Sequence, residues 1–138
     1  MAEALILDAE AVNALAAPST RRVLGDRASA ILTLAYERRA LVRIPAPVLA
    51  EVCRGPRYDA AINQLLNNPG VRVENLTREV ARSAGHMLAR VKLSSAHAVD
   101  AFVVATALLF DTAVIATGDP KNIQRLAAPF PKLGIFSL

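Results

Sequence analysis

The chain has 138 residues, 54% of them hydrophobic and 4% aromatic, so it can bury one ordinary core and has no room for a second domain of similar size. Sixteen Lys and Arg against twelve Asp and Glu give a net charge of +4, which favours a polyanionic partner without requiring one. The only cysteine, Cys53, excludes an internal disulfide and a cysteine-based zinc site. No apolar run reaches the roughly 18 residues of a membrane span, and no basic leader precedes the first apolar run. We therefore expect a single cytoplasmic domain over residues 1–138, outside any membrane.

The first half of the chain alternates short strands with helices. A short apolar run at residues 4–7 predicts a strand that ends at Asp8, and helical spacing follows up to Pro18 and again over residues 26–39. Residues 41–44 predict a second strand. A short helix over residues 48–52 should stop at the turn pair Gly55-Pro56, before another helix at about 58–66.

The second half continues this alternation. Residues 71–73 predict a third strand, and Thr77 is the expected N-cap of a helix reaching about residue 92. Ser94 or Ser95 can cap the next helix, about 96–110, which is apolar on nearly every side and should therefore be buried in the middle of the fold. Residues 113–116, 120–126 and 133–136 predict a strand, a helix and a last strand.

The spacing of the strands predicts an α/β fold. Every two successive strands are separated by far more than a hairpin loop, so we expect a mainly parallel sheet with right-handed crossovers. In such sheets, ligand-binding groups gather at the carboxyl ends of the strands.

Two aspartates directly follow predicted strands. Asp8 comes after the first strand and Asp119 after the fourth, so both should reach the same edge of the sheet. Each also has a simpler interpretation as a helix N-cap, and Asp119-Pro120 is an ideal pairing of N-cap and first helical residue. The two roles can coexist, because a carboxylate has two oxygens.

Two further acids lie inside apolar helices. Asp100 heads an apolar stripe, so its buried charge needs an arginine, the helix N-terminus or a bound cation as a partner. Glu51 lies within the short apolar helix at residues 48–52, where an exposed surface glutamate is the alternative. His97 and His86 are not expected to belong to the site.

Considered together, the four acids favour a metal site. They have no cysteine or histidine companions that would indicate zinc. Hard carboxylate oxygens with open coordination positions select Mg²⁺ or Mn²⁺, and in nucleases such clusters bind a phosphate oxygen and activate the attacking water.

Four segments carry a resemblance to a known family: residues 7–9 (LDA), 48–52 (VLAEV), 99–107 (VDAFVVATA) and 117–119 (TGD). In this order and spacing, which cover essentially the whole chain, they resemble PIN-domain ribonucleases, specifically VapC-type toxins of bacterial toxin–antitoxin pairs. The resemblance implies a PIN-like three-layer α/β/α sandwich around a mainly parallel five-stranded sheet. It also implies cleavage of RNA by metal-activated water.

The resemblance further assigns roles to individual residues. Asp8, Glu51 and Asp100 would be catalytic metal ligands, with Asp119 a ligand directly or through water and Thr117 a supporting hydroxyl. Glu10 departs from the family pattern, which commonly has a small polar residue there, and is left out of the ligand set.

The family also implies partners, namely an RNA substrate, a second copy of the chain in a homodimer, and a VapB-like antitoxin. Basic residues that shortly follow the site elements are hypothesised to line an RNA groove, although solvated surface charge is their commoner role. These residues are Arg54, Arg57, Lys92, Lys121 and Arg125.

Two other functions remain open. A non-catalytic RNA-binding module with the PIN fold would use the acids as caps and salt bridges. A phosphohydrolase acting on small phosphate esters is a weaker interpretation, because the familiar aspartate-nucleophile arrangement needs a second Asp where Glu10 stands.

Overall fold

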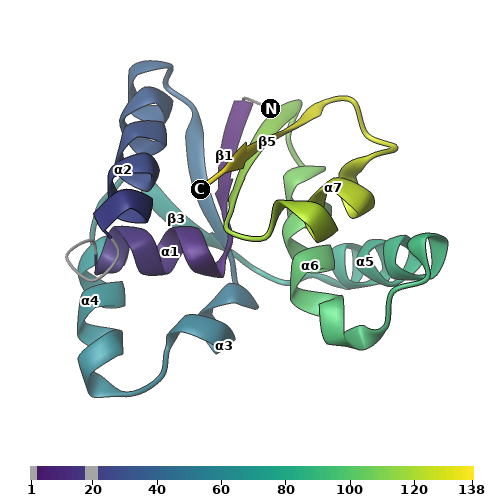
Figure 1. Cartoon of the computed structure of the whole chain (residues 1–138), viewed down its shortest axis with the longest axis horizontal. Helices are drawn as coiled ribbons and strands as arrows, with labels where there is room; N and C mark the ends of the chain where they lie inside the picture. Colours follow the sequence, from purple (N-terminus) through teal and green to yellow (C-terminus); the bar gives the residue numbers. More distant parts are fainter. Residues whose placement is uncertain (1–2, 18–21) are drawn as a thin grey trace.

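Five short strands form one parallel sheet at the centre of the molecule (Figure 1). The computed structural model describes residues 3–17 and 22–138. The strands are β1 (Glu3–Leu7), β2 (Leu41–Pro45), β3 (Val71–Glu74), β4 (Thr112–Thr117) and β5 (Leu133–Ser137). They lie in the order β3-β2-β1-β4-β5, and all four strand pairs are parallel, which confirms the predicted fold class.

Helices cover both faces of the sheet and complete three layers (Figure 1). One side carries α1 (Ala9–Ala16), α2 (Arg22–Glu37), α3 (Val48–Val52) and α4 (Pro56–Leu66). The other carries α5 (Arg78–Val91), α6 (Ala98–Ala107) and α7 (Pro120–Ala127), with a 3₁₀ turn at Ser95–His97 before α6. No helix within residues 3–17 and 22–138 is long and apolar enough to cross a membrane.

The winding direction reverses between β1 and β4. From β1 the chain builds outward through β2 to β3, then returns to the other side of β1 and builds outward through β4 to β5. Because right-handed crossovers in opposite directions place their helices on opposite faces, the loops after β1 and β4 diverge at this point. Open α/β sheets bind ligands at such a switch point, and here Asp8 and Asp119 follow the two strands.

The core is built mainly from Ala, Val, Ile and Leu side chains, in agreement with the aromatic content of 4%. Leu5 on β1 pairs with Val42 on β2 and with Val114 on β4, so these three residues lie on the same face of the sheet. On the opposite face, α6 is buried along most of its length. Its alanines, such as Ala101 and Ala105, allow it to approach the sheet closely and hold its N-terminus near the strand ends.

Two helix boundaries differ most from the predicted ones. The helix predicted to end at Phe110 ends at Ala107, where the bonds from Leu109 N to Thr106 O and from Phe110 N to Ala107 O tighten the chain into a turn. Lys132 Nζ donates hydrogen bonds to the carbonyl oxygens of Leu108 and Phe110 at 2.9 and 2.6 Å. These two carbonyls therefore have a side-chain partner in place of a further turn of helix. At α2 the described helix already begins at Arg22 rather than at residue 26. Pro18, expected to end α1, lies outside the described residues.

An acidic candidate site at the switch point

Asp8 joins the start of α1 to the loop that follows β4. Its side chain is buried, at 6% exposure. Oδ1 accepts a hydrogen bond from the Ala11 amide at 2.9 Å, and Oδ2 accepts one from the Gly118 amide at 3.2 Å. The predicted N-cap is therefore confirmed, and the second oxygen holds the β4–α7 loop beside it.

Thr117 connects the two aspartates of the strand ends. It is fully buried, and its Oγ1 accepts a hydrogen bond from the Asp119 amide at 2.9 Å. Its side chain also hydrogen-bonds to Asp8. Burial raises the pKa of Asp8, and the hydrogen bonds from Thr117, Ala11 and Gly118 oppose this rise because they stabilise the charged carboxylate.

The negative charges of the other three acids all act on Asp100. It lies half-buried in the first turn of α6. Burial raises its pKa to about 6, and the negative charges of Asp119, Asp8 and Glu51 add to the rise, in that order, while His97 opposes it. The four acids selected from the sequence are therefore near enough to interact electrostatically. They follow β1 and β4 or lie on helices α3 and α6.

Glu51 and Asp119 form the exposed part of this cluster. Asp119 does not act as the cap that its pairing with Pro120 predicted, because its side chain makes no capping bond to α7. Instead, Oδ2 accepts a hydrogen bond from Asn122 Nδ2 at 3.2 Å.

The chemistry of these donors suits a hard divalent cation. Among the described residues, no group of three or more Asp, Glu, His or Cys side chains is arranged so that it could hold a metal ion. Four carboxylates that repel one another, with Asp100 pushed toward its neutral form, are nevertheless the arrangement that a divalent cation would stabilise. The chemistry of the four donors therefore suits Mg²⁺ or Mn²⁺.

The acids have two polar neighbours outside the predicted set: Asn122, which the sequence did not suggest, and His97, which was considered and left out. Asn122 on α7 contacts both Asp119 and His97, and the charge of His97 acts on Asp100. The available signals were weak: Asn122 follows Asp119 by three residues on a helix, and His97 precedes Asp100 by three.

Glu10 packs its side chain over the β4–α7 loop. A Cβ atom added at Gly118 would lie 2.4 Å from Glu10 Cγ and 2.6 Å from Glu10 Cβ. The negative charge of Glu10 also contributes to the raised pKa of Asp8, although it is the smallest contribution. Glu10 therefore borders the acids.

The five basic residues proposed for RNA contact are all exposed. Two of them are partly held by backbone carbonyls: Arg54 Nε donates to Glu51 O at 3.2 Å, and Arg125 Nη2 donates to Val91 O at 2.9 Å. Arg54 thus lies at the end of the helix that carries Glu51. The bond from Arg125 ties α7 to the end of α5, next to Lys92.

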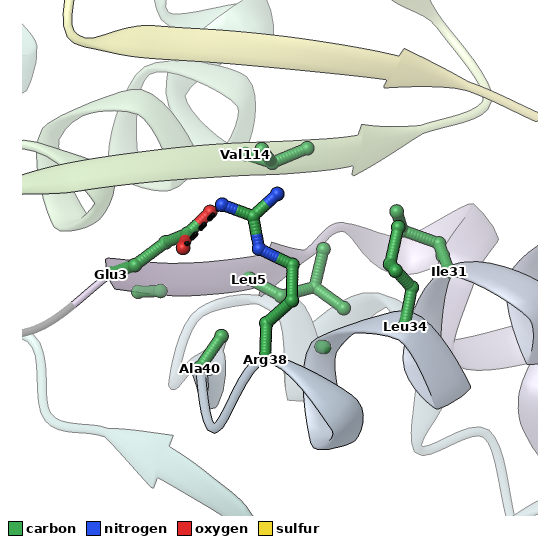
Figure 2. A pocket seen from close by; sticks show the side chains of 9 residues that line it. Glu3, Leu5, Ile31, Leu34, Arg38, Ala40 and Val114 are labelled. Atoms are coloured by element: carbon green, nitrogen blue, oxygen red, sulfur yellow. Dashed lines mark hydrogen bonds and ion pairs between the residues drawn. The ribbon is translucent and has the colours of Figure 1, made fainter.

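A hollow elsewhere on the molecule is separate from these acids. It lies between α2 and strands β1 and β4 and is lined by Leu5, Ile31 and Leu34 among others (Figure 2). An ion pair between Arg38 and Glu3, with 3.0 Å between Nη2 and Oε2, crosses it. Glu3 is the first residue of β1, whereas Asp8 of the acidic cluster follows its last residue, Leu7. The hollow and the acids therefore lie at opposite ends of this strand.

The fold and the site together define a class of protein: an open, doubly wound parallel α/β domain with carboxylates gathered at its switch point. The model of the PIN domain family matches residues 5–129, and the chain belongs to this family. The crystal structure of VapBC2 from Rickettsia felis bound to a DNA fragment from their promoter contains a chain of the same fold. Its TM-score is 0.67 at 14% sequence identity, over 97% of this chain and 98% of that one. No curated protein matches the sequence.

Proposed function

We propose that this protein is a metal-dependent endoribonuclease and the toxin of a VapBC-type toxin–antitoxin pair. The observation that carries the proposal is that the negative charges of Asp8, Glu51 and Asp119 all raise the pKa of Asp100, beside the switch point of the sheet. Membership of the PIN family and the likeness in fold to a chain of the VapBC2 crystal structure support it.

In this proposal, Asp8, Glu51 and Asp100 hold Mg²⁺ or Mn²⁺, and Asp119 contributes directly or through water. When bound, the cation polarises a phosphate oxygen and lowers the pKa of a water molecule, so that water can attack phosphorus at neutral pH. The protein keeps its donors in place: α1 and Gly118 fix Asp8, and the N-terminus of α6 favours the charged form of Asp100. Thr117 links Asp8 to the backbone of Asp119.

RNA is the proposed substrate. A groove for its phosphates would have Arg54 and Arg57 on the side of α3 and α4, and Lys92, Lys121 and Arg125 on the side of α5 and α7. Cations on both sides would offset the repulsion between the acids and the RNA backbone. The net charge of +4 is consistent with this arrangement.

The proposed partners are a second copy of the chain and a VapB-like antitoxin in the cytoplasm. Helix α2 supports a protein contact, because the exposed fractions of its apolar side chains Val23 and Leu34 are 71% and 45%. Leu34 also lines the hollow beside β1.

Light scattering after size exclusion tests the homodimer, and a monomer at all concentrations would contradict it. Co-purification with the product of a neighbouring reading frame tests the antitoxin.

The deciding experiment is incubation of the purified protein with total cellular RNA and Mg²⁺ or Mn²⁺, followed by mapping of the new RNA ends. We expect internal cuts by the wild type and a nearly complete loss of cutting with Asp100→Asn. Circular dichroism should show that this variant keeps its fold. Undiminished cutting by folded Asp100→Asn would refute the proposed role of the acids.

A further inference from the structure

Asn122 connects two elements at the edge of the acidic cluster. It lies in the first turn of α7, and its Nδ2 atom is 3.2 Å from Asp119 Oδ2 and 3.4 Å from His97 Nδ1. His97 is the last residue of the 3₁₀ turn that leads into α6. One amide group thus joins the loop after β4 to the helix that carries Asp100.

The chemistry of the three groups determines which atoms carry hydrogen. An ionised carboxylate can only accept, so the amide nitrogen of Asn122, not its oxygen, faces Asp119. The same NH₂ group has a second hydrogen, which His97 Nδ1 can accept only when that ring nitrogen is unprotonated. A neutral histidine with a free Nδ1 carries its proton on Nε2, and that N–H is left as a donor.

His97 lies close enough to the acids to matter for a substrate. His97 comes three residues before Asp100, at the entry to α6, and Asn122 joins its ring to Asp119, so the ring lies beside the acids. Both His97 and Asn122 are half-buried, which limits the number of orientations that the contact can adopt. An ordered N–H donor beside a cluster of acids is suited to a phosphate oxygen, which the carboxylates alone would repel.

We propose that Asn122 is a positioning residue that orients Asp119 toward the metal site and holds His97 with its Nε2–H available to a phosphate oxygen of the RNA. This inference rests on the proposed nuclease function. It assigns roles to two residues outside the acidic set. Asn122 acts through Asp119 and His97, and only His97 contacts the substrate.

The first test is ¹⁵N NMR of the histidine rings, with His86→Gln used to assign the His97 signals. The wild type should show the Nε2–H form of neutral His97. Asn122→Asp replaces the donor by an acceptor and should shift His97 toward the Nδ1–H form, while Asn122→Ala should leave a mixture of the two. Gln124→Ala, an exposed change on the same helix, should leave the signals unchanged. Identical His97 signals in the wild type and both Asn122 variants would overturn the proposed contact.

The second test measures metal and RNA. Asn122→Ala should weaken Mn²⁺ binding and lower kcat/KM by about 10- to 100-fold, as removal of an outer hydrogen-bond partner typically does. Asn122→Ala should lower kcat/KM less in a protein that already carries His97→Ala than in the wild type, because part of the role of Asn122 is already lost there. Fully additive losses, or unchanged Mn²⁺ binding in Asn122→Ala, would overturn the positioning role.

These measurements separate the inference from the nuclease proposal. If the tautomer and Mn²⁺ binding change as expected but no RNA is cut by any form, the contact stands, while the nuclease function and the phosphate role of His97 fail. If the wild type cuts RNA and Asn122→Ala matches it in every measurement, the nuclease function stands and the inference fails.

Discussion

At the scale of single residues, the protonation state of Asp100 depends first on its burial and then on the negative charges of Asp119, Asp8 and Glu51. Its pKa of about 6, above the ordinary 3.8, means that the folded protein binds this proton more tightly than the unfolded chain does. The contribution of Asp100 to stability therefore falls as pH rises from about 4 to about 6, and stays low above that range. The charge at this position makes the fold less stable at neutral pH when no cation compensates it.

Asp100→Asn should consequently stabilise the metal-free protein at pH 8. We expect the free energy of unfolding to rise by up to about 3 kcal/mol at pH 8, and the gain to shrink toward zero near pH 4. Urea unfolding of the wild type and the variant across this pH range, in the presence of a chelator, measures the difference. Asp26→Asn on exposed α2 is the control and should show no such pH-dependent gain. A constant difference between wild type and Asp100→Asn would contradict the account.

At the scale of elements, the junction of β4 and α7 is shaped by its contact with α1. Asp8 binds the Gly118 amide, and the side chain of Glu10 lies directly over Gly118. The position therefore has no room for a Cβ atom, although its backbone is not in the left-handed region. The glycine is needed because Glu10 approaches it closely, and this contact is not apparent from the neighbouring sequence.

Gly118→Ala should destabilise the fold by about 1–3 kcal/mol, because the added methyl group meets Glu10 Cγ at 2.4 Å. Glu10→Ala should recover part of this loss, since it removes the nearest atom while Glu10 Cβ remains. Gly85→Ala is the matched control: nothing lies within 4 Å of its added Cβ in the middle of α5, so it should stabilise by about 0.5–1 kcal/mol. Chemical denaturation compares the four forms, and equal effects at the two glycines would contradict the steric account.

At the scale of the whole molecule, the sheet gathers acids from distant parts of the chain, and their joint role is tested by adding a cation. If they form a metal site, Mn²⁺ should raise the melting temperature of the wild type in a concentration-dependent way, because a ligand that binds only the folded state stabilises it. Asp100→Asn should lose most of this shift. A non-catalytic module whose acids serve as caps and salt bridges would show no shift, so differential scanning fluorimetry separates the two interpretations.

The basic residues around the site make a second prediction at this scale. Changing Arg57 and Lys121 together to Glu should weaken RNA binding and flatten its dependence on salt, because fewer counterions are then released from the phosphates. The control pair consists of two exposed arginines changed to Glu: Arg22, which begins α2, and Arg39, which lies in the turn after it. Equal effects of both pairs would point to general charge rather than to a groove, and binding and salt dependence unchanged by the first pair would refute the RNA-binding assignment.

Much of this arrangement was determined by the sequence itself. Apolar runs and helical spacing identified all five strands and the order of the helices, because these patterns are local. Asp8 was correctly expected as a cap and at the sheet edge, since parallel strands place their carboxyl ends together. Asp100 stood out because an acid at the head of an apolar helix needs compensation.

Only the tertiary structure decided how these groups meet. The capping pattern at Asp119-Pro120 was misleading, because Asn122 binds the Asp119 carboxylate while the Thr117 hydroxyl binds its amide. The end of α6 depended on Lys132, 22 residues beyond Phe110 in the chain. Contacts of this kind leave no periodic pattern in the sequence, because they join side chains that approach one another only after the helices have packed on the sheet.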